Sequence, residues 1–486
     1  MSEPQDNFES SRLEKLRKIE ELGIDPWGAR FDNHQPISAI RELPFDAQPL
    51  VRVRAAGRVV LRRGQGKVFF IKLWDWTGDV QVMLGQKQVG ETGWAITQNL
   101  DLGDLLGVEG TLGKTRTGEL TIFADNLTYL GKSLQPHPDK WGGMQDMEFR
   151  LRHRYLDLIY NPETLKRTRQ RIDIVSTIRR YLDDQGYCEV ETPTLHAIAG
   201  GAAARPFTTH HNALDIPLFL RIALELPLKR LLVGGIEKVY EMGRVFRNEG
   251  TSPRHNPEFT MLELYQAYGD YRTMMELTEG LIVACVKAVG ESLQLPYGEK
   301  TVDYTPPWKR ASYAELFQEH VGVALEDVER IRRVAEQTGF PTAGKHPDVI
   351  IHHLFEEKVE EKLVGPVFVY DYPAALCPLT KRKRGNPALA ERFELYVQGM
   401  ELANAYTELN DPITQEATFR QQLAGLPEED SMAKMDEDFV RALRHGMPPA
   451  GGLGIGIDRL VMLLTNTQSI RDVILFPLLR PEKKTV

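Results

Sequence analysis

The spacing of apolar residues predicts short strands in the first third of the chain. Between Val51 and Leu130, short apolar runs are separated by turn glycines, which is the pattern of a sheet built from short strands. Five strands are predicted, at Val51–Leu61, Val68–Trp74, Asp79–Leu84, Leu105–Leu112 and Leu120–Leu127. Five short strands in about 80 residues suit a small closed barrel of the OB-fold type.

Apolar residues at helical spacing predict a helix at residues 8–22, ahead of the barrel. The opposite face of this helix is basic. It either carries solvated charges while one stripe packs on the next domain, or it touches an RNA backbone. Helix and barrel together form a predicted first domain, residues 1–135, and a polar connector rich in proline and glycine predicts a linker at 136–160.

Helices and strands mix in the remaining region, residues 161–486. Asn161 and Pro162 predict a helix start, because asparagine is a good N-cap and proline fits the first turn. The predicted buried stripe of this helix is Ile172, Val175, Ile178 and Leu182. Gly186 ends the helix, a strand then runs to Pro193, and a helical insertion is predicted around 310–365.

The stretch 244–268 reads as strand, polar loop, strand. Pro253 and Pro257 exclude a helix in the loop. Alternation after the loop places Glu263 and Tyr265 on one strand face with Phe259, and the same parity before it aligns Arg247 with Glu249. This arrangement suits an anionic ligand with a ring to stack on. The alternative is a surface hairpin with solvated charges.

A second informative hairpin is predicted at 391–408, turning at Gln398-Gly399. Pairing across the turn places Tyr396 opposite Glu401, with Glu394 one diagonal away on the same face. Two such carboxylates beside a triphosphate suit Mg²⁺. Asn404, Tyr406 and Glu408 have the opposite parity from Glu401. If all of them line one cleft, a β-bulge must lie between Glu401 and Asn404.

A glycine-rich strand leads into an apolar helix at Gly451–Leu460. Arg459 lies in the first turn of this helix, close to its positive end, where anions bind. A glycine-rich turn by itself is weak support for a ligand site.

Composition and charge narrow the class of protein. The chain has 486 residues, of which 42% are hydrophobic and 26% are charged, as in ordinary globular proteins. The net charge of -8 disfavours indiscriminate nucleic-acid binding, so any contact with a polyanion must be local. Three dispersed cysteines without a C-x-x-C pair indicate a reducing compartment. With no secretory signal and no membrane span, we expect a cytoplasmic protein.

Three motifs resemble those of the class II aminoacyl-tRNA synthetases. F-R-x-E, a loop and R-H-N-P-E-F (246–259) resemble motif 2, and G-x-G-x-D-R (454–459) resembles motif 3. The helix and strand ending at Pro193 resemble motif 1, although they could be only a core helix and an edge strand. The resemblance implies an α+β chain, in which an antiparallel sheet flanked by helices follows the OB-fold, and a homodimer formed through motif 1.

The same resemblance implies an ATP site. Arg247 would grip the α-phosphate and the amino-acid carboxylate, Phe259 would stack on adenine, and Arg459 would meet adenine and the γ-phosphate. Arg247 and Arg459 are the implied catalytic residues, because they stabilise charge on the phosphates. The remaining implied ATP residues are Glu249, His255, Asn256, Glu394 and Glu401, the last two also holding Mg²⁺.

Within class II, G-G-A-A-A-R-P-F (200–207), T-M-L-E-L-Y (260–265) and N-A-Y-T-E-L-N-D (404–411) resemble the lysine-specific branch. Its implied lysine-binding residues are Gly201, Glu225, Arg247, Glu263, Tyr265, Asn404, Tyr406 and Glu408. Carboxylates and aromatic rings suit a desolvated ammonium, whereas an aspartate site would need an arginine or lysine. One departure is Leu224, where the branch usually has proline.

The barrel segment resembles the anticodon-binding domain of the lysine, aspartate and asparagine subgroup. Its first strand and turn are basic, which suits an RNA backbone, and the next strand carries Phe69-Phe70. The implied anticodon residues are Phe70, which would stack on a base, and Gln81 and Glu119, which would bond its edge. In the alternative, Phe70 is a core residue and Phe69 faces the RNA.

The implied activity is that of a lysine-specific class II enzyme. It activates L-lysine with ATP to lysyl-adenylate and transfers the lysyl group to the 3′ end of tRNA(Lys). Two alternatives stay open: a ligase of the same catalytic fold that attaches lysine to a protein, and a non-catalytic tRNA-binding relative. The complete OB-fold argues against the first, and the retained arginines and glutamates argue against the second.

Overall fold

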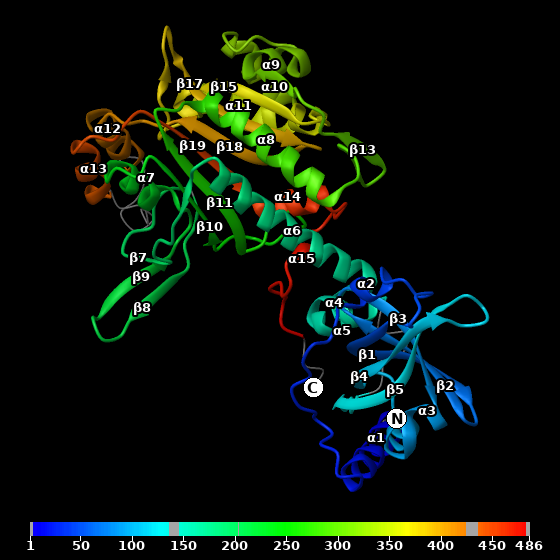
Figure 1. The fold of residues 1–486 in the computed structure, drawn as a ribbon. Helices are drawn as coiled ribbons and strands as arrows, with labels where there is room; N and C mark the ends of the chain where they lie inside the picture. Colours follow the sequence, from blue (N-terminus) through cyan, green and yellow to red (C-terminus); the bar gives the residue numbers. More distant parts are fainter. Residues whose placement is uncertain (1–2, 136–144, 203, 424–435, 483–486) are drawn as a thin grey trace. The chain divides into compact units, whose positions relative to one another are not determined.

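The computed structural model describes residues 3–135, 145–202, 204–423 and 436–482 (Figure 1). The chain divides into two compact units, Met1–Arg150 and Leu151–Val486. Part of the predicted linker, 136–144, lies outside the described residues. The later part of that linker is helical, with α4 at Met147–Arg152 and α5 at Arg154–Tyr160.

The first unit is built around a closed five-stranded barrel with the strand order β1-β2-β3-β5-β4. The strands are β1 Arg52–Gln65, β2 Val68–Asp75, β3 Gly78–Gly85, β4 Leu105–Lys114 and β5 Leu120–Gly131. The helices are α1 Glu3–Glu21, α2 Ile37–Arg41 and α3 Gln86–Asn99. All five strands were predicted from the short apolar runs and the turn glycines between them, and the OB-fold prediction is confirmed. Helix α3, between β3 and β4, was not expected.

The second unit is organised by a nine-stranded, mostly antiparallel sheet with the order β14-β15-β17-β18-β19-β11-β10-β6 and with β16 beside β17. The strands are β6 Cys188–Glu189, β10 Lys238–Phe246, β11 Glu258–Ala267, β14 Lys309–Ser312, β15 Val367–Pro373, β16 Arg382–Lys383, β17 Asn386–Val397, β18 Met400–Thr407 and β19 Ala450–Gly456. Only the β14–β15 and β10–β6 pairs are parallel. The α+β fold class is confirmed.

Helices cover this sheet and flank its ends. The helices are α6 Pro162–Asp184, α7 Glu225–Val233, α8 Tyr271–Val289, α9 Tyr313–Val321, α10 Val328–Gln337, α11 Pro347–Lys358, α12 Pro412–Leu423, α13 Glu437–Arg444, α14 Ile457–Leu464 and α15 Ile470–Val473. Short 3-10 turns lie at Glu360–Lys362 and Ala374–Leu376. Two small sheets complete the unit, formed by β7 Leu195–His196, β8 Thr208–His211 and β9 Ile216–Leu220, and by β12 Gln294–Tyr297 and β13 Lys300–Asp303.

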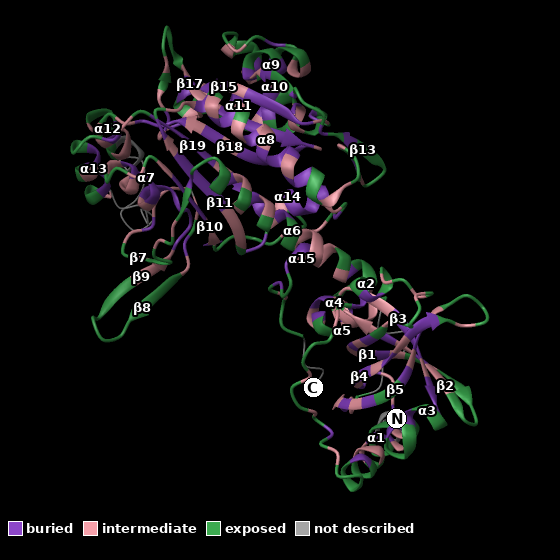
Figure 2. Ribbon diagram, viewed as in Figure 1, coloured by how far each residue is buried: buried purple, intermediate pink, exposed green. Residues whose placement is uncertain are grey.

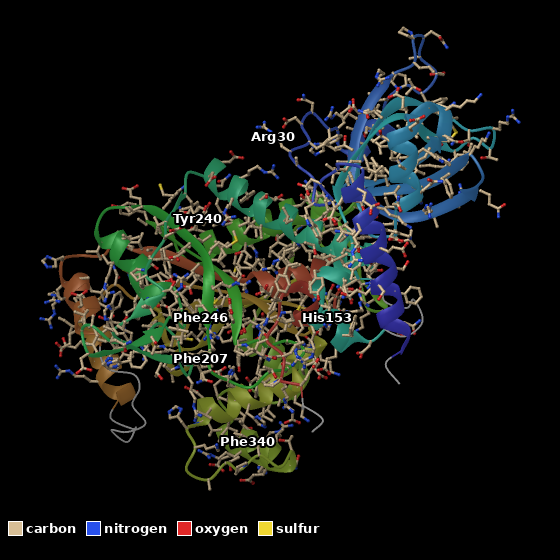
Figure 3. The ribbon with its side chains drawn as sticks, turned by 90° about the horizontal axis from the view of Figure 1, so that it is seen from below. Arg30, His153, Phe207, Tyr240, Phe246 and Phe340 are labelled. Atoms are coloured by element: carbon tan, nitrogen blue, oxygen red, sulfur yellow. The ribbon has the colours of Figure 1, made fainter. Side chains whose placement is uncertain are left out.

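Strand alternation gives the large sheet one apolar face and a second face, here called the polar face, which carries polar side chains between two further apolar clusters. Leu262, Leu264, Leu453 and Ile455 are buried in the core that includes residues of α6, α8 and α14. Their neighbours along the same strands point to the other face, because successive side chains alternate. Figure 2 shows the sheet as largely buried. In Figure 3, Tyr240 and Phe246 are labelled on β10, and Tyr240 is fully buried. The functional residues lie on the polar face.

Helix α6 begins at Pro162 with Asn161 as its N-cap residue, as predicted. The Asn161 side chain does not cap the helix but donates to Asp157. The predicted buried stripe is partly wrong. Ile174, Ile178 and Leu182 are buried, whereas Ile172 is 47% exposed. The helical periodicity was right, but the apolar residues occupy more than one face and the sequence did not show which face meets the sheet.

The hairpin of β17 and β18 has the predicted turn and register. Val397 pairs with Met400 across Gln398-Gly399, where both turn residues have positive φ. Tyr396 pairs with Glu401, but Leu395 pairs with Ala403, so Leu402 is an extra residue on β18. The β-bulge predicted between Glu401 and Asn404 is therefore confirmed. It turns Glu401 to the face that also carries Asn404 and Tyr406.

None of the helices in the described parts of the chain is both long and apolar enough to cross a membrane.

Candidate active site

Two adjoining cavities lie on the polar face of the sheet, with volumes of about 270 and 310 Å³. They share the residues Arg247, Met261, Asn404 and Gly454. The first cavity is bounded largely by the β10–β11 loop and the start of α14, and the second lies deeper, toward α7. Arg247, at the boundary, can contact ligands in both cavities.

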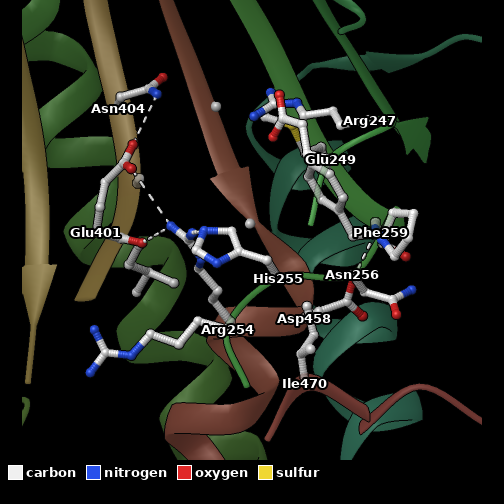
Figure 4. Close-up of a pocket in the computed structure, with 18 of the residues that line it drawn as sticks. Arg247, Glu249, Arg254, His255, Asn256, Phe259, Glu401, Asn404, Asp458 and Ile470 are labelled. Atoms are coloured by element: carbon white, nitrogen blue, oxygen red, sulfur yellow. Dashed lines mark hydrogen bonds and ion pairs between the residues drawn. The ribbon is translucent and has the colours of Figure 1, made fainter. Parts of the chain in front are cut away.

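The first cavity contains seven of the eight residues predicted for ATP. They are Arg247, Glu249, His255, Asn256, Phe259, Glu401 and Arg459. Figure 4 shows Glu401 and Asn404 facing the cavity from one side and Arg247 and Phe259 from the other. The predicted parity of Arg247 and Glu249 on a strand is wrong, because β10 ends at Phe246 and both residues lie in the loop. The Arg247 amide still bonds the Pro257 carbonyl at 2.8 Å, which continues the pairing by one step.

Arginine side chains at this cavity are held from several sides. The Arg247 guanidinium lies 5.2 Å from the Phe259 ring centre, which leaves a cation over an aromatic face. Arg459 donates to the Glu401 carbonyl oxygen at 2.7 Å, and its Nη2 lies 3.2 Å from His255 Nε2. Burial, followed by the charge of Arg459, lowers the pKa of His255. His255 is therefore neutral near pH 7, so the cavity presents arginine charge to an anion without an additional imidazolium.

Two further residues of this cavity were not assigned from the sequence. Arg254 lines it and donates to the Gly399 carbonyl oxygen at 3.0 Å. Asp458 is 2% exposed and accepts from Arg171 of α6 at 2.6 Å and from the Thr260 amide at 2.7 Å. Asp458 is a positioning residue that ties the start of α14 to α6 and β11. In the sequence, Asp458 was visible as the aspartate of the G-x-G-x-D-R motif, but it was given no role.

The predicted Mg²⁺ pair is divided by the structure. Glu401 lines the first cavity, whereas Glu394 is 5% exposed and lies outside that lining. Glu394 pairs with Arg392 and accepts from Tyr372 at 2.7 Å and Tyr396 at 2.6 Å. A carboxylate offers about four lone-pair sites, so one remains. Glu394 faces Asn404 across the hairpin, and Asn404 donates to Glu401, so both carboxylates flank one amide.

These donors fit Mg²⁺ as a partner of bound phosphates. Among the described residues, no three His, Cys, Asp or Glu side chains form a metal-binding group. Mg²⁺ needs only one or two carboxylates when phosphate oxygens and waters complete its shell. Glu401 is the accessible ligand, and Glu394 is the buried candidate for the second position.

The second cavity contains seven of the eight residues predicted for lysine. They are Gly201, Glu225, Arg247, Glu263, Tyr265, Asn404 and Tyr406. Gly201 has φ of +86°, and a Cβ there would lie 3.1 Å from Ala223, so glycine suits both the backbone and the space. Arg392 and the segment 376–380 also line the cavity and were not assigned from the sequence.

Glu263 is the most informative of these residues because it is 5% exposed and, among the residues that the structure describes, has no basic partner within hydrogen-bond distance. Its Oε1 accepts from the Leu224 amide at 2.9 Å, and its Oε2 accepts from the Tyr265 hydroxyl at 3.2 Å. Burial and the neighbouring Glu225 raise the pKa of Glu263 to about 7. A ligand ammonium in this cavity would favour the ionised form.

Glu408, the eighth predicted residue, does not line the cavity. It is fully buried behind Gly452, and its Oε2 lies 2.5 Å from the Lys229 ammonium. Its Oε1 has no hydrogen-bond partner in the part of the chain that the structure describes. A Cβ on Gly452 would lie 1.9 Å from this oxygen. Gly452 lines the cavity and therefore separates it from Glu408 Oε1, the acceptor without a donor.

A separate cavity of about 530 Å³ lies on the barrel of the first unit. Its residues are Arg63, Phe70, Gln81, Met83, Lys114, Thr115, Arg116, Thr117 and Phe123. Phe70 lines this cavity, whereas Phe69 packs on Trp94 with ring centres 5.7 Å apart, so Phe70 is the ring of the pair that faces the cavity. Gln81 accepts from Arg63 at 2.5 Å and donates to Thr121 at 2.8 Å, which fixes its amide. Glu119 is exposed next to the Thr115–Thr117 turn and does not line the cavity.

The basic first strand offers less charge to an RNA than its sequence suggested. Arg52 pairs with Asp125, and Arg54 pairs with Glu109. Arg58 and Arg62 donate to backbone carbonyl oxygens. Acids on other strands, invisible from the strand alone, neutralise part of the basic run. The cations at the cavity are Arg63, Lys114 and Arg116.

Two family profiles match this chain, one over each unit. The profile described as tRNA synthetases class II (D, K and N) matches residues 146–480, and the profile of the OB-fold nucleic acid binding domain matches residues 53–130. The class II synthetase profile over the catalytic unit, together with an OB-fold ahead of it, therefore defines an aminoacyl-tRNA ligase of class II.

Relatives that match nearly the full length of the chain show which branch of class II it belongs to. The Lysine--tRNA ligase of Moorella thermoacetica is 50% identical over 487 residues, covering 99% of each chain. That of Bacillus subtilis is 50% identical and covers 96% of each chain, and that of Staphylococcus saprophyticus is 48% identical, covering 99% of this chain and all of its own. The chain belongs to the class II tRNA synthetases of the D, K and N group, in the branch of the lysine–tRNA ligases. The predicted family is confirmed.

Replacing Gly452 with alanine tests the wall of the second cavity. The new Cβ would lie 1.9 Å from Glu408 Oε1 and 2.5 Å from Tyr265 Cε1, so both side chains must move. Because misplacement by about 1 Å can cost about 100-fold, we expect the KM for L-lysine to rise at least about tenfold in lysine-dependent pyrophosphate exchange. Gly365→Ala, with no atom within 4 Å of the new Cβ, is the matched control. An unchanged KM in Gly452→Ala would contradict this geometry.

Leu224 lets the Glu263 hydrogen bond be tested by a matched pair of variants. Leu224→Pro and Leu224→Ala both remove the leucine side chain, but only proline removes the amide donor. Without the donor the pKa of Glu263 rises further above about 7, so more of it is protonated at neutral pH. At pH 7 the KM for L-lysine should be about tenfold higher in the proline variant than in the alanine variant. Toward pH 8.5 the two KM values should become similar. A ratio independent of pH would show that the bond does not control ionisation.

Proposed function

We propose that this chain activates L-lysine with ATP and transfers the lysyl group to tRNA(Lys), using the residues of the two joined cavities. The observation that carries the proposal is the continuity of the cavities at Arg247. One cavity has arginines and an aromatic ring for a nucleotide. The other has buried carboxylates for a ligand with two ammonium groups.

The second cavity would bind lysine through its α-amino and carboxylate groups at one end and its side-chain ammonium at the other. Gly201 and Glu225 would hold the α-ammonium, and Arg247 would hold the carboxylate. Glu263, Tyr265, Asn404, Tyr406 and Glu408 would hold the side-chain ammonium. Support comes from the Glu263 carboxylate without a basic partner and from the orphan oxygen of Glu408, because each gains a donor when lysine binds. An aspartate side chain would meet repulsion there.

In the first step an oxygen of the lysine carboxylate forms a bond to the ATP α-phosphorus, and the bond to the leaving pyrophosphate breaks. Arg247 orients the attacking carboxylate and the α-phosphate, and Arg459 stabilises charge on the leaving group. His255 and Asn256 position the nucleotide with Glu249, and Phe259 provides the stacking surface. Glu401 and Glu394 would hold Mg²⁺, which supplies positive charge on the phosphate oxygens when bound.

In the second step the terminal 3′-hydroxyl of the tRNA takes the lysyl group, and AMP leaves. The barrel would select the tRNA by its anticodon. Phe70 would stack on a base, and Gln81, with an amide fixed by Arg63 and Thr121, would bond the edge of that base. Glu119, from the neighbouring turn, would bond the same edge. We propose 1–135 as the tRNA-selecting part and 161–486 as the catalytic part.

We further propose a cytoplasmic homodimer. All three cysteines are free, which agrees with a reducing compartment. Motif 1 and the segment that follows it leave apolar side chains exposed on a single chain, as an interface would: Ile172 is 47%, Leu195 47% and Leu214 64% exposed. Leu195 lies two residues beyond Pro193, and Leu214 is in the exposed β8–β9 hairpin visible in Figure 2.

The two alternative functions have less support. A ligase that modifies a protein would not need the barrel cavity around Phe70 and Gln81. A non-catalytic relative would not need arginines held at a nucleotide cavity beside buried carboxylates.

Replacing Arg247 with alanine tests the catalytic assignment. The variant loses the cation shared by both cavities, so lysine-dependent exchange of pyrophosphate into ATP should fall at least about 1,000-fold. Arg330→Ala, an exposed residue on α10, controls for loss of an arginine as such. Exchange near the wild-type rate in Arg247→Ala would contradict the proposed mechanism.

Replacing Phe70 with alanine tests the tRNA-selecting part separately. Stacking on one base is worth about 1–3 kcal/mol, so the KM for tRNA(Lys) should rise about 5- to 150-fold. Pyrophosphate exchange without tRNA should not change. Phe69→Ala is the matched control, because Phe69 packs on Trp94 and not in the cavity. A larger tRNA effect in Phe69→Ala would reverse the assignment of the two rings.

A further inference from the structure

Lys229 is a buried cation behind the lysine cavity. It lies on α7, one turn after Glu225, and no part of it is exposed. Its Nζ lies 2.6 Å from Glu225 Oε1 and 2.5 Å from Glu408 Oε2. Tyr265 is the next neighbour, with its ring centre 5.9 Å from Nζ. The enzyme's own lysine thus joins two of the carboxylates proposed to bind the substrate lysine.

The arrangement balances charge when the substrate is present. Glu225, Glu263 and Glu408 are three carboxylates, and Lys229 and Arg247 are two cations. Arg392, the other cation on the lining, is paired with Glu394. The site therefore has one excess negative charge, and L-lysine, with two ammonium groups and one carboxylate, has one excess positive charge. Without Lys229, lysine would leave an unbalanced buried anion, which is costly.

We propose that Lys229 is a positioning residue that holds the Glu225 and Glu408 carboxylates in place and favours the ionised form of Glu408, so that the cavity binds L-lysine. This inference rests on the proposed function. Burial opposes the charged form of Lys229, but the Glu225 and Glu408 carboxylates outweigh it and raise its pKa, so the ammonium persists. Burial also raises the pKa of Glu408, and the Lys229 ammonium is the group that opposes this rise most strongly.

Charged and titratable groups from three elements face this pair. Glu225 comes from α7, Glu408 follows β18, and Glu263 and Tyr265 come from β11. Glu225 and Glu263 both disfavour a charge on Glu408. Tyr265 remains protonated, because burial raises its pKa well above the ordinary value. Lys229 is thus the resident cation in direct contact with Glu408 among the described residues.

The test is the KM for L-lysine in pyrophosphate exchange between pH 6.5 and 8.5, as a ratio of variant to wild type. Taking the ratio at each pH cancels the ionisation of free lysine. In Lys229→Met the counter-ion is lost, which raises the pKa of the Glu408 carboxyl by about 1–3 units, so a larger fraction of Glu408 is protonated at pH 7 than in the wild type. The ratio should be at least about tenfold at pH 7 and should fall as the pH rises. Lys229→Arg keeps the charge and should keep the wild-type pH profile, whatever its absolute KM.

Two controls separate this role from a structural one. The KM for ATP should stay within about twofold of wild type, and Lys287→Met, an exposed lysine on α8, should match wild type at every pH. If Lys229→Met does not fold, Lys229→Gln is measured with the same expectation. A ratio that does not change with pH, or that stays near one, overturns the inference. Wild-type exchange that does not need L-lysine would instead overturn the proposed function.

Discussion

Burying three carboxylates around one cavity is the constraint that organises this catalytic unit. An ionised carboxylate away from water is costly unless cations or donors face it. Here Glu225 and Glu408 share Lys229, while Glu263 has only the Leu224 amide and the Tyr265 hydroxyl. The free enzyme therefore holds a site whose negative charge is incompletely balanced. Binding of a diammonium ligand relieves that imbalance, so specificity follows from the same burial that makes the empty site costly.

The large sheet makes this arrangement possible by separating its two faces. Leu262, Leu264 and Leu453 pack into the core, while Glu263, Tyr265 and Gly452 face the cavity. The glycines of β19 are needed for space: side chains at 452 would collide with Tyr265 and Glu408. The bulge at Leu402 turns Glu401 toward the nucleotide cavity while Asn404 and Tyr406 remain on the same face. A regular strand could not serve both cavities.

Much of this could be predicted from the sequence where a local rule decided the outcome. Short apolar runs between turn glycines predicted the barrel strands, alternation predicted the faces of β11, and conflicting parities predicted the bulge. Prediction was weaker for charged side chains whose ion-pair or hydrogen-bond partners come from distant parts of the sequence. Arg52 and Arg54 looked available until Asp125 and Glu109 paired with them. Glu394 looked like an open metal ligand, but Tyr372 and Arg392 surround it. Lys229 had a readable signal, one helical turn after Glu225, but its burial depends on the distant Glu408.

The central claim is that L-lysine binds by completing the charge balance of buried carboxylates. Titration calorimetry of L-lysine into the enzyme, in buffers with different ionisation enthalpies, counts the protons released on binding. Glu263, with a pKa of about 7, should release about 0.9 proton at pH 6, about 0.5 at pH 7 and few at pH 8. Any fraction of Glu408 that is protonated in the free enzyme adds to these numbers, because burial raises its pKa as well. Tight binding of L-lysine with no proton release between pH 6 and 8 would contradict the account.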